Sequence, residues 1–559
     1  MRYSVVTMFI DDSTCTRNGK ACRRVLLRNS YRAHGKVRHD TLANLSQCSD
    51  EEIEALKLAL KHKGRLTDLG TLEDHFGAQQ GLAVGAVWVL NQLAKQLGIT
   101  QALGRSRAAT LALWLVLATV IEQGSRLCAV RLAQRHAVCD ILKLDRFNED
   151  DLYQAMDWLA QRQSDIELTL FNQRYQNPAQ PPVLYLYEVT SSYLEGEHNE
   201  LGEYGYNRDG KRGNKQSVIG LLTDEQGWPL SVEVFAGNTQ DPPTVKHQID
   251  KLAQRFGVKK VTFVGDRGMI KSLQINDISA ADFHYITAIT KPQIEALIRA
   301  ELLQWSMFDE QLVEVIDDKI RYVLRRNPLR AEELAAARQS KLQRLQRLVE
   351  QRNAYLQTHP KAKVETALKK VQSQAEQLKI HTWIEIKTKQ RKLLIEINEA
   401  AKNHAARLDG CYVIKTDLAA ELACTETVHA RYKGLAEVEF AFRTMKTTLL
   451  EMRGIFVRKA NRTRAHVFII MLAYLLAYHL RRRWSDIELT VQEGIAELAS
   501  ICAMDLIMPN GVACQIIPEP RPLGQRLLQR LNITLPDAIP QRNVNVVTRK
   551  KLVSERKVA

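Results

Sequence analysis

The sequence lacks the features of a secreted or disulfide-stabilised protein. Its nine cysteines are scattered, none stands in a CxxC pair, and the nearest neighbours are Cys15 and Cys22. This spacing suits neither a zinc ribbon nor a disulfide scaffold, so we expect a reducing, cytoplasmic setting. The opening stretch "MRYSVVTMFIDD" has an apolar run too short for a signal peptide, and acids follow it directly.

The sequence also lacks long hydrophobic runs. Its two most apolar stretches, "TLALWLVLATVI" and "HVFIIMLAYLLAYHL", are shorter than the roughly 18–20 residues that a membrane span needs. We therefore expect both to be buried helices and expect no membrane partner.

Acidic residues are fewer than basic ones. The 559 residues include 79 Lys and Arg against 63 Asp and Glu, which gives a formal net charge of +16. A large basic chain of this kind is often a polyanion binder, and nucleic acid is the leading candidate. A basic protein without such a partner is the alternative that charge alone leaves open.

The pattern of strands, turn and helix in residues 1–70 predicts a small basic module. "RRVLLRNSYRAHGKVRHDTLANL" indicates a β-hairpin, and "SDEEIEALKLALKHKG" indicates a helix with Ser49 as its cap. DNA contact and a solvated surface are both compatible with the cluster of cations, which comprises Arg17, Lys20, Arg23, Arg24, Arg28, Arg32, Lys36 and Arg38. Residues 71–178 then show apolar residues every three or four positions, which predicts a helical domain for DNA binding or assembly.

The pattern changes at residues 179–300, where strands replace the helical periodicity. Apolar segments at 183–189, 217–223, 230–236, 261–266 and 284–290 read as strands, and a helix capped by Asp241 stands between the third and fourth. Three strands in series followed by alternating helices and strands indicate an α/β fold with a mixed sheet.

The remaining chain predicts an insertion and the rest of the core. Residues 301–408 contain two charged helices with narrow apolar stripes, which indicate a helical hairpin, and then a β-hairpin. A long insertion is well tolerated because closing a longer surface loop costs little extra. We expect the core to continue over 409–485 and a helical region with a basic tail over 486–559.

Three acids stand at informative places. Glu188 ends the first predicted strand, and Asp266 ends the fourth, in "VGDRGM". Ligands usually bind at the carboxyl ends of such strands. A strand-end acid that caps a helix or pairs with Arg is the structural alternative for each. The third acid, Glu439, lies in "RYKGLAEVEFAFRTMKTTLLEMRG", seven residues from both Tyr432 and Lys446, so the three share one face if a helix extends back to Tyr432.

Three acids from separate segments suit phosphodiester chemistry. In-line attack on a phosphodiester commonly uses two divalent metals about 3.5–4 Å apart. Hard cations such as Mg²⁺ prefer carboxylate oxygens. Arg443 and Lys446 on the same helix could then bind phosphates beside the metals.

These motifs resemble the DDE transposases of bacterial insertion sequences. Tyr432, Glu439 and Lys446 match the signature Y-x2-R-x3-E-x6-K of the IS-four-like superfamily, although Leu435 occupies the Arg position. "VGDRGM" is similar to the second-acid motif, and "YEVTSS" is similar to the first, which usually reads "YDVTS".

The resemblance implies a ribonuclease-H-like α/β catalytic domain with a helical and β insertion, preceded by the basic module and the helical domain. It implies that Glu188, Asp266 and Glu439 hold two Mg²⁺ ions, with Mn²⁺ as a substitute. It further implies cleavage at the element ends, strand transfer into target DNA, double-stranded DNA as partner and a homodimer on paired ends.

The resemblance also implies that Tyr432 contacts DNA, together with Arg443 and Lys446. Two further basic segments could contact that DNA. One is the loop with Arg208, Lys211 and Arg212 between the first two strands, for which a solvated hairpin tip is equally compatible; the other begins at Arg453.

Glu188 keeps two further hypotheses open. Glu is one methylene longer than the expected Asp, and catalytic geometry tolerates only about 0.5 Å of displacement. A transposase-derived DNA-binding protein that no longer cuts, and a structure-specific nuclease of the same fold, are therefore the alternatives.

Overall fold

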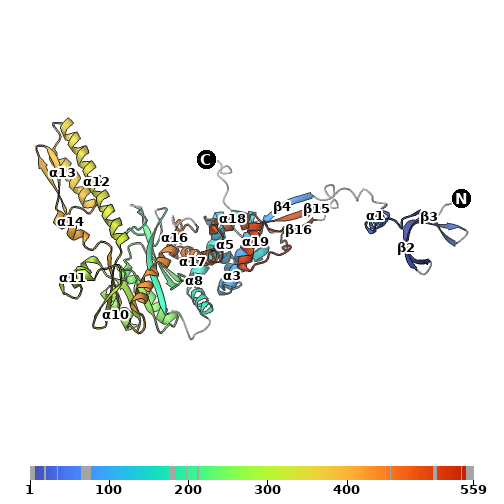
Figure 1. The fold of residues 1–559 in the computed structure, drawn as a ribbon, viewed down its shortest axis with the longest axis horizontal. Coiled ribbons are helices and arrows are strands. Elements are labelled where there is room, and N and C mark those ends of the chain that lie inside the picture. The colour runs from blue at the N-terminus through green and yellow to red at the C-terminus, as the bar shows by residue number, and fades with distance from the viewer. Residues whose placement is uncertain are drawn as a thin grey trace. The chain divides into compact units, whose positions relative to one another are not determined.

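The computed structural model divides the chain into two compact units. The structure describes residues 7–17, 20–33, 36–63, 77–175, 183–196, 198–210, 213–446, 449–452, 455–507, 513–542, 544 and 546–548. The first unit comprises Met1–Gly81, Cys502–Pro518 and Pro536–Ile539, and the second comprises Leu82–Ile501, Glu519–Leu535 and Pro540–Ala559. Figure 1 shows the elements of both.

The first unit begins with an antiparallel sheet in the order β1-β2-β3 and a helix, α1. Strands β2 and β3 are the predicted hairpin, and β1 is a third strand that the sequence pattern did not reveal. The bounds are Thr7–Arg17 for β1, Lys20–Ala33 for β2, Lys36–Asn44 for β3 and Asp50–Lys61 for α1. Helix α1 starts with the predicted cap, since the Ser49 hydroxyl accepts a hydrogen bond from the backbone N–H of Glu52.

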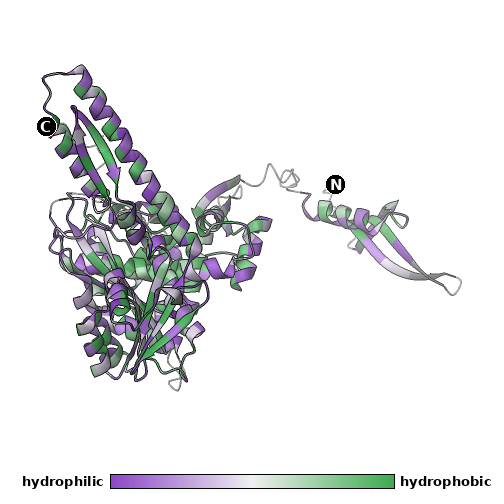
Figure 2. Cartoon of the chain, turned by 60° about the vertical axis from the view of Figure 1, so that its left-hand side comes forward, coloured by the Kyte–Doolittle hydropathy of each residue, from purple (hydrophilic) through white to green (hydrophobic). Residues whose placement is uncertain are grey.

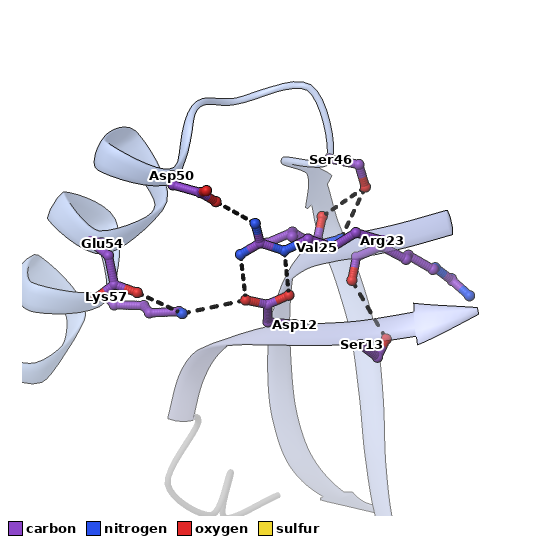
Figure 3. A network of polar contacts seen from close by, with 9 residues as sticks. Asp12, Ser13, Arg23, Val25, Ser46, Asp50, Glu54 and Lys57 are labelled. Atoms are coloured by element: carbon purple, nitrogen blue, oxygen red, sulfur yellow. Dashed lines mark hydrogen bonds and ion pairs between the residues drawn. The ribbon is translucent and has the colours of Figure 1, made fainter. Parts of the chain in front are cut away.

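A polar network joins α1 to this sheet (Figure 3). Arg23 donates two hydrogen bonds to Asp12, at 2.9 and 2.8 Å, and also pairs with Asp50, while Lys57 reaches Asp12 at 3.4 Å. The hydrogen bonds from Arg23 lower the pKa of Asp12 to about 2. Arg28 pairs with another acid of β1 at 2.7 Å, so at least two of the predicted surface cations are engaged inside the module.

A second small sheet, in the order β16-β15-β4, also belongs largely to this unit. Its strands are β4 (Gly77–Ala83), β15 (Cys502–Ile507) and β16 (Ala513–Ile516). The expectation of helix throughout 71–178 is wrong for β4, and the expectation of a helical region over 486–559 is wrong for β15 and β16. Two glycines weaken helix formation in β4, and its pairing partner lies more than about 400 residues away in the chain, where local periodicity gives no signal.

The second unit contains the predicted helical domain. Helices α5, α8 and α17 pack on one another. The helices of this region are α3 (Gly85–Gln96), α4 (Ile99–Leu103), α5 (Arg107–Ile121), α6 (Arg126–Arg135), α7 (Val138–Leu142), α8 (Glu149–Arg174), α17 (Ala460–Arg483), α18 (Val491–Ala499) and α19 (Pro522–Leu531). Among the described residues α17 alone is long and apolar enough by itself to span a membrane, but 83% of its apolar window is buried within the protein.

The second unit also contains an eight-stranded mixed sheet in the order β10-β11-β14-β9-β8-β5-β6-β7. The bounds are β5 (Leu184–Tyr193), β6 (Gln216–Asp224), β7 (Pro229–Ala236), β8 (Thr262–Gly265), β9 (His284–Ala288), β10 (Val313–Asp317), β11 (Ile320–Arg326) and β14 (Cys411–Thr416). The five strands predicted over 183–290 are all present, and β8 runs parallel to both β5 and β9. This confirms the predicted α/β mixed sheet.

Helices cover both faces of the sheet. Tyr185 and Tyr187 of β5 point into a core that includes residues of α9 (Asp241–Asp250) and α10 (Ser272–Ala280). Alternation along a strand places Leu186 and Glu188 on the opposite face, which α16 (Leu435–Lys446) covers. The acid of interest therefore lies on the face that the late helix shares.

The chain leaves the sheet between β11 and β14. Strands β10 and β11 fall within the predicted insertion 301–408, yet they pair into the main sheet. The projecting segment then comprises α12 (Pro328–Thr358), α13 (Val364–Gln377), β12 (Ile384–Lys389), β13 (Lys392–Ile397) and α14 (Glu399–Ala406). It has its own hydrophobic core around Leu345 and Val371, as the stripes predict, and its paired helices mix hydrophilic and hydrophobic residues along their length (Figure 2).

Candidate active site

Two of the predicted catalytic acids lie on neighbouring parallel strands at the centre of the sheet. The register of β5 and β8 sets Tyr187 opposite Gly265. Glu188 directly follows Tyr187, and Asp266 directly follows Gly265. Because paired strands are roughly 4.8 Å apart, the register brings these two acids side by side. Glu188 does not end its strand as expected, because β5 continues to Tyr193 beside β6; it stands where β8 ends.

The third acid, Glu439, comes from α16, which packs against β5. Val438, Phe442 and Met445 form a buried stripe at helical spacing, which a reading of apolar periodicity also predicts. Lys446 at the end of the helix donates a hydrogen bond to the Thr190 hydroxyl of β5 at 2.9 Å. Glu439 itself is exposed, so α16 carries its carboxylate at the surface over the same strand as Glu188.

Tyr432 belongs to a separate short helix. Helix α15 (Thr425–Lys433) ends at Gly434, and α16 begins directly after it, so the single helix from Tyr432 to Lys446 that would align the signature residues is absent. Tyr432 nevertheless reaches the acids, because its hydroxyl donates a hydrogen bond to an Asp266 carboxylate oxygen at 3.3 Å. Burial raises the pKa of Tyr432, and the charge of Asp266 adds to this effect.

The electrostatics of the site centre on Glu188. Burial, together with the negative charges of Asp266 and Glu439, raises the pKa of this carboxyl to about 8, although the backbone N–H of Val189 and the charge of Arg208 oppose the shift. Because Glu188 experiences the charges of both other acids, the three carboxylates belong to one electrostatic cluster. Within the described part of the chain, none of the three forms an ion pair with Lys or Arg.

The donor chemistry of this cluster fits a hard divalent cation. Carboxylate oxygens are the ligands that Mg²⁺ prefers, and like charges without a cationic partner are relieved by a bound cation. No three described His, Cys, Asp or Glu side chains stand close enough together to share one ion as they are placed. The acids thus converge by strand register, packing and charge without forming a finished ligand set.

The predicted phosphate-binding residues have different environments. Lys446 is almost completely buried and pairs with Asp209 at 2.6 Å, so a phosphate contact would require this ion pair to open. Arg208 forms two hydrogen bonds with Asp241, at 2.6 and 2.5 Å. Arg443 is exposed on α16. Their contacts with DNA stay predictions, and Lys211, Arg212 and Arg453 lie outside the described residues.

The partners of these cations were missed by the sequence analysis. Asp209 is the one acid in the sequence of the basic loop, and nothing in the surrounding residues indicates its role. Its side chain is only 2% exposed. Asp241 is the first residue of α9, whose cap is Gln240, so the expected capping role is wrong and the carboxylate binds Arg208 instead. The backbone N–H of Arg208 also bonds the Ser191 hydroxyl at 3.0 Å, which attaches this loop to β5.

The strand order from β5 to β9 and the position of the acids define a class of enzyme. Counted along the chain from β5, five neighbouring strands lie in the order 3-2-1-4-5, with acids from the first strand, from the end of the fourth and from a helix packed on the first. This is the arrangement expected for a ribonuclease-H-like phosphoryl-transfer enzyme.

Comparisons with known proteins give the family. Residues 189–476 match the family described as "Transposase DDE domain", and residues 12–72 match "IS1634 family transposase, N-terminal domain". The chain belongs to the DDE transposases of bacterial insertion sequences, and it is a DNA transposase.

Other comparisons add little. A cryo-EM structure of a piggyBac transposase synaptic complex with hairpin DNA is similar at 7% identity and a TM-score of 0.36, over 70% of this chain and 69% of that one. No curated protein sequence matches the chain.

Proposed function

We propose that Glu188, Asp266 and Glu439 hold the divalent metal with which this transposase cleaves the ends of its insertion sequence and joins them to target DNA. The observation that carries the proposal is the shared electrostatic cluster at Glu188, which has no cationic partner among the described residues. Two Mg²⁺ ions, replaceable by Mn²⁺, are the proposed complement. When bound, they would stabilise the charge that develops on the scissile phosphate and assist deprotonation of the attacking hydroxyl.

The chain's own residues have separate roles in this scheme. Glu188 must lose its proton before it can hold a cation, because its pKa of about 8 keeps most of it protonated at neutral pH. The Tyr432 hydroxyl donates to Asp266 and so orients that carboxylate. Lys446 and Thr190 hold α16 against β5 and thereby keep Glu439 near the other two acids.

The proposed DNA contacts follow the same geometry. Arg443 lies one turn beyond Glu439 on α16, and Arg208 belongs to a loop attached to β5, so both can approach phosphates beside the acids. Lys211, Arg212 and Arg453 are also proposed DNA contacts, on sequence grounds alone, because they lie outside the described residues. We further propose that the protein works in the cytoplasm as a homodimer on paired double-stranded ends, with the helical part of the second unit serving in assembly.

A cleavage assay tests the proposal. Purified protein is incubated with labelled DNA carrying its own element end and a target plasmid, with Mg²⁺, with Mn²⁺ or with EDTA. We expect strand cleavage and joining with either metal and neither with EDTA. Glu188→Asp addresses the extra methylene: if the wild type binds the end without cutting and this variant cuts, the protein is a catalytically impaired transposase. Equal cleavage of unrelated branched DNA would indicate a structure-specific nuclease.

A further inference from the structure

A cavity of about 450 Å³ lies behind the strand ends that carry the acids. Its floor is a row across three sheet strands, since Lys415 of β14 pairs with Tyr322 of β11 on one side and with Thr287 of β9 on the other. Arg267, which directly follows Asp266, lines the same cavity. Thr287 and Tyr285 share one face of β9, so the cavity lies on the sheet face opposite Glu188 and meets the metal-site acids only at the edge.

The charged side chains that line this cavity are positive. Among the described residues, three cations line it, Arg267, Lys271 and Lys415, and no described Asp or Glu does. Helices α10 and α11 (Lys291–Arg299) both begin at its wall, and the N-terminal ends of helices carry partial positive charge. The cavity therefore favours an anion.

Lys415 is the most unusual of the three cations. It is half-buried, and it forms no ion pair with any residue in the described ranges. Burial alone lowers its pKa, with no acid to oppose the effect. An ammonium group held part-way out of water without a counter-ion is costly unless a ligand supplies the negative charge.

Much of the remaining lining is apolar, and Ser272, Thr290 and Gln293 add uncharged polar groups. Ile270, Ile275, Ile289 and Leu297 surround the polar floor, and the volume falls in the range of small-molecule sites. A free inorganic anion would leave these walls unused. A phosphorylated ligand with a flat, weakly polar part would contact both the cations and the walls.

We propose that this cavity is a nucleotide subsite, in which Lys415 and Arg267 bind a phosphate and the isoleucine walls receive the attached base. The nucleotide comes either from a DNA strand that passes the edge of the sheet near Asp266 or from solution as a free nucleotide. The first source rests on the proposed cleavage function, and the second does not.

Equilibrium binding in EDTA tests this inference without requiring catalysis. The probes are a fluorescent aminopurine deoxynucleoside monophosphate, the same nucleoside without phosphate, and a phosphorylated single-stranded tetranucleotide carrying the same base. We expect a phosphorylated probe to bind the wild type and Lys415→Met to weaken it about tenfold, as for loss of a charged hydrogen bond. Lys260→Met, which removes an exposed lysine outside the cavity, should change affinity less than about twofold.

A second variant separates shape from charge. Ala296→Trp fills the cavity from its exposed rim and leaves all three cations in place, so it should also abolish probe binding while the unfolding temperature stays close to that of wild type. Binding of the tetranucleotide alone identifies a DNA strand as the source, and equal binding of the mononucleotide identifies a free nucleotide. Unchanged affinity in both cavity variants, or equal binding of the unphosphorylated nucleoside, would overturn the subsite.

The same assay distinguishes this proposal from the metal site. Asp266→Ala and Glu439→Ala should keep probe binding in EDTA even where they abolish cleavage. If the acids prove dispensable for cleavage but Lys415→Met still loses the probe, the metal assignment fails and the subsite stands.

Discussion

Two glutamates of the second unit, Glu167 and Glu188, have opposite electrostatic environments. Glu167 of α8 is fully buried and accepts hydrogen bonds from Ser231, from the backbone of Val232 and from Arg255, at 2.8, 3.3 and 2.8 Å. Glu188 of β5 forms no ion pair with a described residue, and burial, with the charges of two further acids, raises its pKa to about 8.

The difference separates a structural carboxylate from a functional one. The interactions of Glu167 hold α8 on β7 and on the π-helical turn Lys251–Arg255, so its charge is satisfied by the fold. The fold does not stabilise the charged form of Glu188, which is the state expected of a group whose partner is a ligand. Substitutions at the two positions should therefore affect stability and activity in opposite proportions.

The largest expected effect is the loss of cleavage when a partner of Glu188 is removed. Asp266→Ala and Glu439→Ala should each reduce strand cleavage by more than about a hundredfold, since loss of outer-shell groups alone costs up to that much at metal sites. Both variants should fold normally, because these side chains form no ion pair with a described residue. Glu437→Ala, an exposed acid two residues before Glu439 on α16, is the matched control and should keep wild-type cleavage. Full activity in both test variants would exclude the assigned acids.

The next effect is on stability, at Glu167. Glu167→Gln removes the charge that Arg255 requires and should lower the free energy of unfolding by about 3 kcal/mol, the lower end for a broken buried pair because Arg255 is 30% exposed. Chemical denaturation of the metal-free protein measures the change. Cleavage per folded molecule should stay within about twofold of wild type, since Glu167 lies outside the acid cluster. A larger loss of cleavage, measured where all of the variant protein is folded, would contradict the structural role of Glu167.

Glu188→Gln should do the reverse, stabilising the metal-free protein while abolishing cleavage. The folded pKa of Glu188, about 8, exceeds its ordinary value of 4.5, so the folded state holds the proton more tightly. Wild-type stability is therefore unaffected below about pH 4.5 and falls as the pH rises from there to about 8. One pKa unit corresponds to about 1.4 kcal/mol, and pH 7 lies 2.5 units above the ordinary pKa, so the variant should exceed wild type by about 3 kcal/mol near pH 7. Chemical denaturation in EDTA at pH 5 and pH 8 measures the free energy of unfolding of both proteins. The same change with pH in wild type and variant would contradict the prediction.

Sequence patterns predicted the sheet better than the site. Apolar residues at strand spacing identify β5 to β9, and apolar residues at helical spacing identify the stripe on α16. Burial of one face imposes each periodicity. The same reasoning found Glu188, Asp266 and Glu439 as acids next to strands or on a helix. It missed β1, β4, β10, β11, β15 and β16, which have little apolar alternation or pair with distant segments. The condition that one helix extends from Tyr432 through Glu439 is not met, because α15 ends at Gly434.

The polar partners could not have been predicted. Glu167, Asp209 and Asp241 each bind a cation from a different element, and the pairs are separated along the chain by from about 30 to more than 200 residues. Such pairs depend on how side chains meet after folding, and no local spacing encodes them. The distinction between Glu167 and Glu188 is therefore visible only in the structure.

The smallest expected effect is the stabilisation of the protein by Mg²⁺, and it tests the comparison without catalysis. A ligand at tenfold its dissociation constant stabilises the folded state by about 1.4 kcal/mol. Because a protonated carboxyl cannot hold the ion, the rise in unfolding temperature should be greater at pH 8 than at pH 6 in the wild type. Glu188→Gln should reduce the rise and remove its pH dependence, whereas Glu167→Gln should keep both, although it starts from a lower temperature. A pH-dependent rise that survives in Glu188→Gln would place the titrating ligand elsewhere and remove the reason for treating the two glutamates as different kinds of acid.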